Sequence, residues 1–418
     1  MYSIFEEKFM KKTLGILLLM VLTMSLFAAT DGGSYKKVVT VPFRPTLYSN
    51  PGTLAYKMYS NQAELARNRF MLQLPTVSVT MYNVARTMSA PTTAEALSKI
   101  THLDFSSANL INLASKMMLN LGTGRNDVIS INAGAGFAIS KFGFSFDFNA
   151  DSKTKPSDGS TGIQNIYNTE VVPLINAAAT VAYGTRIYET NSFFLDLGVG
   201  VRYALKGYAT GISGKNAVEY LEHSTPLQMK AKSGFAIPFD VALTFGMMNG
   251  NLRFNLSANN LNGYYYMKEY QIDKPEDLIN VITGKTTPIS GSEFVLYTPW
   301  QLNLGIVWEP KLKVLNPVFS FTIEDINGYI QEDLKKDGGK KPGLELITHL
   351  SARIDLRIVK VVNLSVAFQN GYPMLGLSAG FKGNTIEVSY SFHEAGDLYG
   401  AKPVDALTFR VKLGFDSN

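Results

Sequence analysis

The chain contains no cysteine, and Asp, Glu, Lys and Arg make up 17% of its 418 residues, against about 25% in an average globular protein. Without cysteine there is no disulfide framework and no lipid-attachment cysteine after a leader. No uninterrupted apolar run reaches the roughly 18–20 residues that a membrane-spanning helix requires. The net charge of +5 is spread out, and no basic stripe carries interleaved aromatic residues, so nucleic acid is not expected as a partner. The composition leaves a buried-sheet enzyme or a barrel.

Motifs that carry catalysis are also missing. The sequence has no GxSxG elbow, no Walker loop and no dinucleotide-binding fingerprint after a strand. Its four histidines, His102, His223, His349 and His393, show no metal-ligand spacing. We therefore predict no enzymatic activity, no catalytic residue, no metal site and no cofactor.

The N-terminus has the pattern of a secretory signal peptide. Lys11 and Lys12 precede a largely apolar stretch over 14–28, which ends in small residues around Ala29. This predicts a signal peptide over 1–29. A single membrane anchor is the other interpretation, but an apolar run of about 15 residues is short of a span.

The segment KFGFSFDFNA, residues 141–150, places phenylalanine at every second position. Successive side chains of a strand point to opposite faces, so the segment is predicted to be a strand with one apolar and one polar face. The same alternation recurs along the chain and predicts about fourteen strands, over 69–82, 128–138, 141–150, 173–184, 195–203, 234–246, 252–259, 301–308, 317–324, 350–358, 362–369, 373–382, 385–392 and 407–415.

Connection lengths alternate in the same way. Short connections fall near Ser140 and at 185–192, 247–251, 310–316, 359–361 and 383–384, whereas long ones fall at 83–127, 151–172, 206–233, 260–300, 325–345 and 393–403. The short connection 370–372 is an exception. Tight turns at one end and long loops at the other are typical of a bacterial outer-membrane barrel, whose tight turns face the periplasm.

The two tryptophans agree with a membrane barrel. Trp300 and Trp308 share one strand face, and eight residues rise roughly 20 Å along the axis of a barrel whose strands tilt by about 40°. The apolar band of such barrels is about 25 Å tall and is flanked by aromatic girdles, so both are predicted to be girdle residues. An exported soluble sandwich also alternates, but it has to blunt its edge strands, and no blunted strand stands out. We predict an all-β fold, a transmembrane antiparallel up-and-down barrel.

The stretch before the first strand does not alternate. SNPGTLAY, residues 49–56, resembles the N-terminal Asn-Pro-Ala signature of the FadL-like and TraF-like outer-membrane barrel transporters, although Gly52 stands where those proteins usually have alanine. EAGDLYGAKP, residues 394–403, resembles the final hairpin of uncharacterised members of that group. The resemblance implies a short helical hatch inside the lumen over 30–68, with Asn50, Pro51 and Gly52 in it. An ordinary turn remains the other interpretation, because Asn, Pro and Gly favour turns locally.

The remaining chain, 69–418, is assigned to the barrel with long external loops. A helical insertion is predicted at 91–120, either in the first external loop or as part of the plug. The polar face carries the lumen-facing candidates Arg202, Arg253, Arg353, Asp355, Arg357, Glu387, Arg410 and Lys412. Inside a barrel these charges either pair structurally across the lumen or line a water-filled path.

An aromatic cluster, Tyr264, Tyr265 and Tyr266, is predicted to lie in the long loop 260–300. It is either an external capture site for a hydrophobic ligand or a packed part of the rim. The sequence as a whole predicts an outer-membrane barrel that takes up small hydrophobic molecules passively through a plugged lumen. The expected partners are membrane lipid, the barrel-assembly machinery and the hydrophobic substrate. The second hypothesis is a structural or surface-interaction barrel without conductance.

Overall fold

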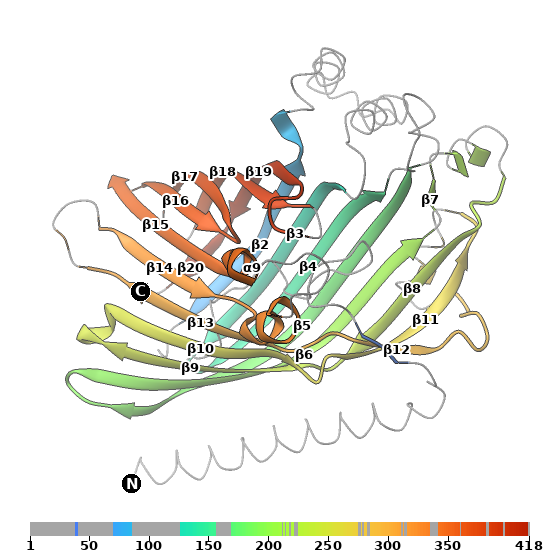
Figure 1. Cartoon of the computed structure of the whole chain (residues 1–418). Helices are drawn as coiled ribbons and strands as arrows, with labels where there is room; N and C mark the ends of the chain where they lie inside the picture. The colour runs from blue at the N-terminus through green and yellow to red at the C-terminus, as the bar shows by residue number, and fades with distance from the viewer. Residues whose placement is uncertain are drawn as a thin grey trace, which may run out of the picture.

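The computed structural model is a closed antiparallel barrel of fourteen strands (Figure 1). It describes residues 38–40, 70–85, 126–155, 169–210, 225–274, 285–310, 316–334, 342–359, 361–381, 384–395 and 398–416, with short loop pieces at 212–213, 215–216, 219–220, 277, 280–281 and 312. The predicted signal peptide, the hatch residues Asn50, Pro51 and Gly52, and the helical insertion at 91–120 lie outside the described residues.

Within the described residues the sheet has twenty strand segments. They are β1 (Val38–Thr40), β2 (Met71–Tyr82), β3 (Asn126–Ile139), β4 (Phe142–Lys155), β5 (Glu170–Glu189), β6 (Phe193–Thr210), β7 (Ile212–Ser213), β8 (Met229–Ala236), β9 (Phe239–Met247), β10 (Leu252–Leu261), β11 (Tyr264–Ile272), β12 (Phe294–Tyr297), β13 (Gln301–Trp308), β14 (Val318–Ile323), β15 (Leu350–Val359), β16 (Val362–Gln369), β17 (Tyr372–Phe381), β18 (Asn384–Glu394), β19 (Pro403–Lys412) and β20 (Gly414–Asp416). The helical elements are η3 (Met248–Gly250), α8 (Ile326–Gly328), η4 (Tyr329–Asp333) and α9 (Pro342–Thr348).

The barrel closes where its last strand meets its first. β19 pairs with β2 from Ala406↔Tyr82 to Val411↔Val77, and β20 continues the contact at Phe415↔Leu72. From β2 onward the barrel strands follow one another in chain order, whereas β1 pairs in parallel with β12. Four barrel strands are each built from two segments, namely β8 with β9, β10 with β11, β12 with β13, and β19 with β20. Pairing of the first barrel strand with the last is how strands satisfy their backbone groups in a membrane.

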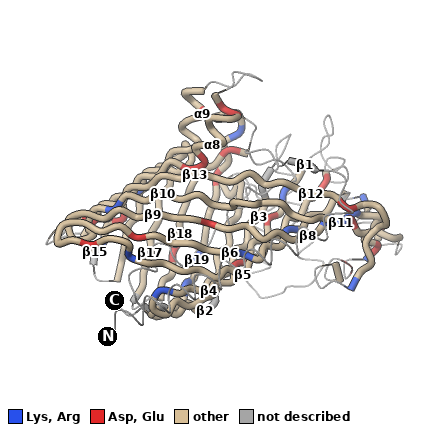
Figure 2. Tube along the Cα trace, turned by 90° about the horizontal axis from the view of Figure 1, so that it is seen from below, with Lys and Arg blue, Asp and Glu red and all other residues tan. Residues whose placement is uncertain are grey.

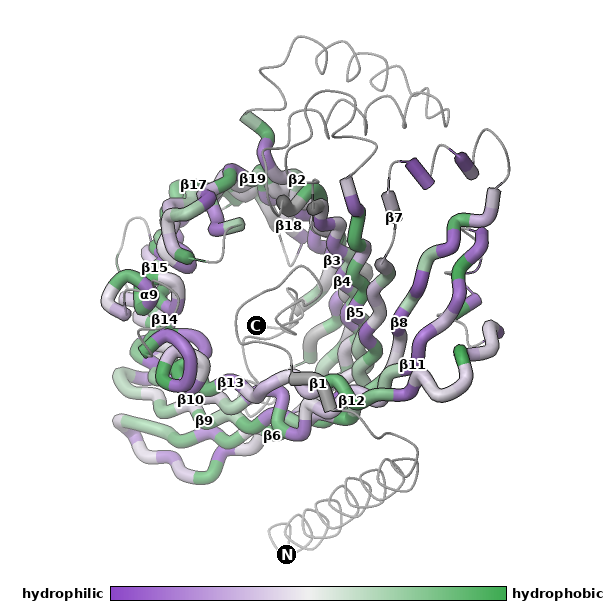
Figure 3. The backbone as a smooth tube through the Cα atoms, turned by 45° about the vertical axis from the view of Figure 1, so that its right-hand side comes forward, coloured by the Kyte–Doolittle hydropathy of each residue, from purple (hydrophilic) through white to green (hydrophobic). Residues whose placement is uncertain are grey.

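Three of these interruptions lie side by side, and we call them the break line. β8 and β9 separate at Pro238, β10 and β11 at Asn262 and Gly263, and β12 and β13 at Pro299. Proline has no N–H for the ladder, so the two prolines interrupt pairing. Gly263 tolerates no side chain here, because an added Cβ would lie 2.3 Å from the Thr298 carbonyl oxygen. Beyond the break line β8 and β11 lean away from the ring of strands (Figure 3).

The burial pattern is the reverse of that in a soluble protein. In the segment KFGFSFDFNA, Phe142, Phe144 and Phe146 are 38%, 38% and 48% exposed, whereas Ser145 and Asp147 are 5% and 4% exposed. The last strand repeats this, with Phe409 46% exposed on the outer face. An apolar exterior around a polar interior is what a bilayer requires, so the apolar faces of the strands meet lipid.

Aromatic side chains gather at two levels of the outer face. Near the short turns, Phe193 is 5.5 Å from Tyr188 and 5.7 Å from Phe245, between ring centroids. Toward the long loops, Phe235 is 5.7 Å from Tyr203 and 6.0 Å from Tyr266. Phe193 and Tyr203 both lie on β6, and ten residues rise about 25 Å along the barrel axis at a tilt of about 40°. The spacing matches the apolar band of a membrane barrel.

The wall is not equally tall around the barrel. β5 has 20 residues and β6 has 18, whereas β14 has six. Within the described residues, no helix is long and apolar enough to cross a membrane.

The structure confirms the fourteen-strand barrel and corrects two expected loops. The segment 260–300 is not one long loop, because β11 and β12 occupy Tyr264–Ile272 and Phe294–Tyr297. The segment 206–233 likewise begins with the end of β6 and ends with the start of β8. Both errors have one physical cause: the strands continue past the break line, where proline and glycine look like loop residues in the sequence.

Candidate functional site

A buried polar cluster lies on the lumen face at the break line. Arg202 of β6 donates from Nη2 to Oδ1 of Asp240 on β9, at 2.8 Å. Asp240 Oδ1 also accepts from the backbone N–H of Asn260 at 2.8 Å. Arg202 and Asp240 are 6% and 2% exposed, so the ion pair is desolvated. It joins three neighbouring barrel strands where their ladders are interrupted.

Two further side chains complete the cluster. Asn260 donates from Nδ2 to the carbonyl oxygen of Thr298 at 2.9 Å, and Lys206 donates from Nζ to the Thr298 hydroxyl at 3.3 Å. The Lys206 ammonium also lies 4.9 Å from the centroid of the Tyr265 ring, a cation–π contact. With Arg202, Lys206 and one carboxylate, the cluster carries one more positive than negative charge.

An apolar cluster lies beyond the break line on the same face. It consists of residues from five strands, namely Ala178, Ala204, Ala236, Tyr265, Met267, Phe294 and Leu296. Met267 is 0% exposed and is flanked by Tyr265 on its own strand. The lumen wall therefore changes from apolar at the end with the long loops to charged at the break line.

The sequence predicted one residue of this site. Arg202 was predicted to face the lumen, but Lys206, Asp240 and Asn260 were missed. The alternation that placed Arg202 on the polar face extends in the same phase to Lys206. Asp240 alternates with Phe239 and Val241 in the same way, next to a proline that obscures the strand.

The other predicted lumen charges pair along the wall rather than across the lumen. Arg353 bonds Asp355 two residues away, with Nη2 at 2.8 Å from Oδ1, and Arg410 bonds Glu387 on the neighbouring strand at 3.0 Å. Arg253 pairs with Glu309 at the end with the short turns. Arg357 is exposed near the β15–β16 turn, and Lys412 is half-buried opposite Thr385. These charges do not converge on one point.

A row of asparagine side chains on the lumen wall had not been expected. Asn132, Asn149 and Asn176 lie opposite one another on β3, β4 and β5. Asn149 Nδ2 donates to Asn132 Oδ1 at 2.8 Å, and Asn176 Nδ2 donates to Asn149 Oδ1 at 3.3 Å. Each asparagine is simply the polar member of an alternating strand, and its alignment with the others depends on strand register. This row leads along the lumen wall to the break line, because Asn176 pairs with Lys206 in the β5–β6 register.

The three tyrosines predicted as a loop patch lie on strand β11. Tyr264 is 42% exposed and stacks on Tyr297 at 4.6 Å on the outer face, together with Tyr266. Tyr265 points the other way, into the lumen cluster, and is 4% exposed. A strand separates neighbouring side chains to opposite faces, so the three cannot form one external patch.

The two tryptophans occupy different settings. Trp308 is 44% exposed on the outer face and stacks on Phe319 at 5.2 Å. Trp300 is half-buried beside Pro299, and its carbonyl oxygen accepts a hydrogen bond from Asn327. Their assignment to the two girdles stays a prediction.

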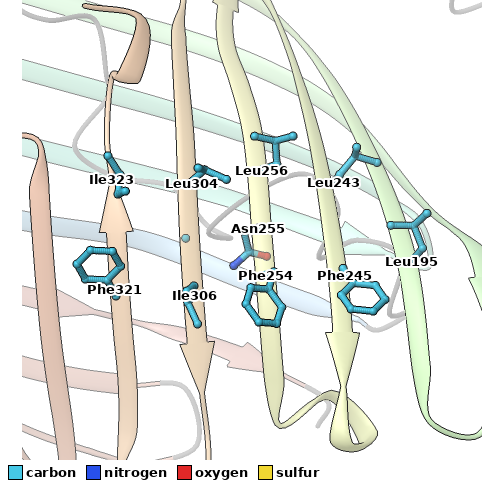
Figure 4. A pocket seen from close by; sticks show the side chains of 11 residues that line it. Leu195, Leu243, Phe245, Phe254, Asn255, Leu256, Leu304, Ile306, Phe321 and Ile323 are labelled. Carbon is cyan, nitrogen blue, oxygen red and sulfur yellow. The ribbon is translucent and has the colours of Figure 1, made fainter. Parts of the chain in front are cut away.

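A hollow of about 450 Å³ lies on the outer face of the barrel (Figure 4). Two register rows line it, one with Phe245, Phe254, Ile306 and Phe321 and one with Leu243, Leu256, Leu304 and Ile323. Because these side chains belong to the apolar outer face, the hollow is part of the lipid-facing wall. It is not an entrance to the lumen.

No protein-family model matches the sequence, and no curated protein matches it. Among solved structures, a FadL homologue from Pseudomonas aeruginosa has 10% identity and a TM-score of 0.40, with 86% of this chain and 93% of the other covered. The toluene transporter TodX of Pseudomonas putida has 9% identity and a TM-score of 0.38, with 86% and 92% covered. The translocator domain of the autotransporter NalP from Neisseria meningitidis has 9% identity and a TM-score of 0.33, with 83% and 87% covered.

Proposed function

We propose that this outer-membrane barrel takes up small hydrophobic molecules passively, and that the apolar cluster, whose side chains are buried against one another in this structure, forms part of their path through the lumen. A lumen of fourteen strands is too wide to be filled by the side chains of its own wall, so a path or a stopper is expected there. The observation that carries the proposal is the position of Met267, Phe294 and Leu296, which face the interior of an otherwise polar wall. Apolar and aromatic side chains bind apolar or ring-shaped ligands.

The polarity of the lumen wall also changes along the path of the ligand. Beyond the apolar cluster it meets the Arg202–Asp240 pair and Lys206, and across β3, β4 and β5 the asparagine row. A hydrophobic solute gains affinity at the apolar cluster and loses it at the polar wall, so it is not retained. Passive transport needs binding that favours entry and still permits release.

The test compares two buried lumen methionines. Met267 lies in the apolar cluster, and Met374 of β17 is 9% exposed on another part of the lumen face. In cells whose uptake of toluene or decane depends on the protein, we expect M267Q to slow this uptake about ten-fold. A ten-fold change corresponds to a loss of about 1.4 kcal/mol of affinity. M374Q is expected to transport at the normal rate. Heat-dependent gel mobility checks that both variants are folded. Equal rates for the two variants would contradict a role for the cluster.

The second experiment addresses the hatch. We propose that residues 30–68 form a stopper in the lumen, as the SNPGTLAY resemblance implies. Single-channel conductance in planar bilayers is expected to rise when 31–68 are deleted. If neither the full chain nor the deletion variant conducts, the result would favour the structural, non-conducting barrel.

A further inference from the structure

The connection between β14 and β15 carries three short helical elements, which we call the rim hairpin: α8, η4 and α9. It stands off from the wall beside β13 (Figure 2). Its position is unusual because β14 has six residues, which rise only about 15 Å along the axis of a barrel with a band of about 25 Å. The wall at β14 therefore ends before the apolar band does.

The depth of the rim hairpin follows from its bonds to β13. Asn327 of α8 accepts from the backbone N–H of Leu302 at 2.7 Å and donates to the carbonyl oxygen of Trp300. Leu302 lies between the two aromatic levels of its own barrel strand, six residues from Trp308 and five from Tyr297. It is thus about 15 Å above Trp308 along the axis, inside the band rather than beyond it. α8 is attached to the wall at the depth of the outer leaflet.

The buried polar groups of the rim hairpin are paired, whereas Gln331 is exposed. Asp325 accepts from the backbone N–H of Gly328 at 3.3 Å, and the Asn303 side chain accepts from the backbone N–H of Asp325 at 2.8 Å. His349 Nε2 lies 2.9 Å from Oδ2 of Asp333, which is 1% exposed. Unpaired polar groups cost several kcal/mol each in hydrocarbon, so this pairing suits an element at membrane depth.

Three apolar side chains of the rim hairpin are exposed, Ile330 at 55%, Leu334 at 47% and Leu344 at 42%. The strand that leads into the hairpin, β14, presents Phe321 and Ile323 on its apolar outer face.

We propose that the rim hairpin is an interfacial element whose occupant is the lipid hydrocarbon of the outer leaflet. Ile330, Leu334 and Leu344 lie among the acyl chains, at the depth of about 5–10 Å that amphipathic interfacial elements reach. The hairpin thereby completes the low side of the wall, where β14 is too short.

The absence of cysteine makes a direct test possible, because each introduced cysteine is unique. We would label I330C, L334C and L344C with a nitroxide in liposomes and compare collisions with oxygen, which concentrates in hydrocarbon, and with a water-soluble nickel chelate. L256C, on the outer face of β10, is the lipid control, and N191C, exposed in the β5–β6 turn, is the aqueous control. G343C is a fourth labelling site on the rim hairpin, where an added side chain meets open space.

We expect the labels at 330, 334 and 344 to match L256C, with oxygen favoured over nickel. Labels that match N191C would overturn the proposal, because the surface would then face water. Protection from both reagents together with spin–spin broadening would also overturn it, because the hairpin would then pack on a second copy of the chain. Heat-dependent gel mobility confirms that each labelled protein is folded.

Discussion

Asn327 offers the sharpest test of how the barrel wall is sealed beside β13. Strand β13 pairs with β14 only from Leu304 onward, so Gln301, Leu302 and Asn303 of β13 have no strand neighbour on the β14 side. The Asn327 amide substitutes for the missing strand, because it accepts from the N–H of Leu302 and donates to the carbonyl of Trp300. Replacement by alanine removes both partners at once.

The expected magnitude follows from those two groups. A buried backbone group without a partner costs about 1–3 kcal/mol, so N327A is expected to lower the free energy of unfolding by about 2–6 kcal/mol. Unfolding by guanidinium in phospholipid vesicles, followed by tryptophan fluorescence, measures this. Trp300 and Trp308 are the two tryptophans of the chain, and Trp300 is itself a partner of Asn327.

The control is an asparagine of the lumen wall. Asn363 donates from Nδ2 to the Ser378 hydroxyl at 3.4 Å and is half-buried, so N363A is expected to cost less than about 1 kcal/mol. If N327A and N363A destabilise the barrel equally, the side chain does not seal a membrane-exposed edge and the reasoning fails.

Two further predictions concern the break line and the rim. R202A leaves Asp240 buried without its cation and is expected to cost about 3–5 kcal/mol, whereas the double variant R202M/D240N is expected to recover most of the loss; equal unfolding midpoints for the single and double variants would contradict this. Gly371 has φ +90° and an added Cβ would lie 2.4 Å from the Tyr399 ring, so G371A is expected to cost about 1–3 kcal/mol. Y399F, which removes the bond from the Tyr399 hydroxyl to the Gly371 carbonyl, should cost about 1 kcal/mol, and a G371A no less stable than Y399F would contradict the steric argument.

The sequence by itself determined the strands and the direction of their faces. Alternation is a local property of an extended chain, so Phe142, Phe144 and Phe146 had to share one side wherever the strand lay. The alternation of short turns and long loops indicated an outer-membrane barrel. These features placed Arg202, Arg353 and Arg410 on the inner face without any knowledge of their neighbours.

The tertiary structure decided what those inner side chains meet. Arg202 and Asp240 lie on different strands, and the register that brings them together depends on pairing across the whole sheet. Met267 and Phe294 form an apolar patch inside the lumen because β11 and β12 continue past prolines and glycines that look like loop residues locally. Likewise, the contact of His349 with Asp333 arises from the folding of the rim hairpin. Local pattern fixes orientation because each residue carries its own geometry, whereas contacts between distant residues depend on closure of the barrel.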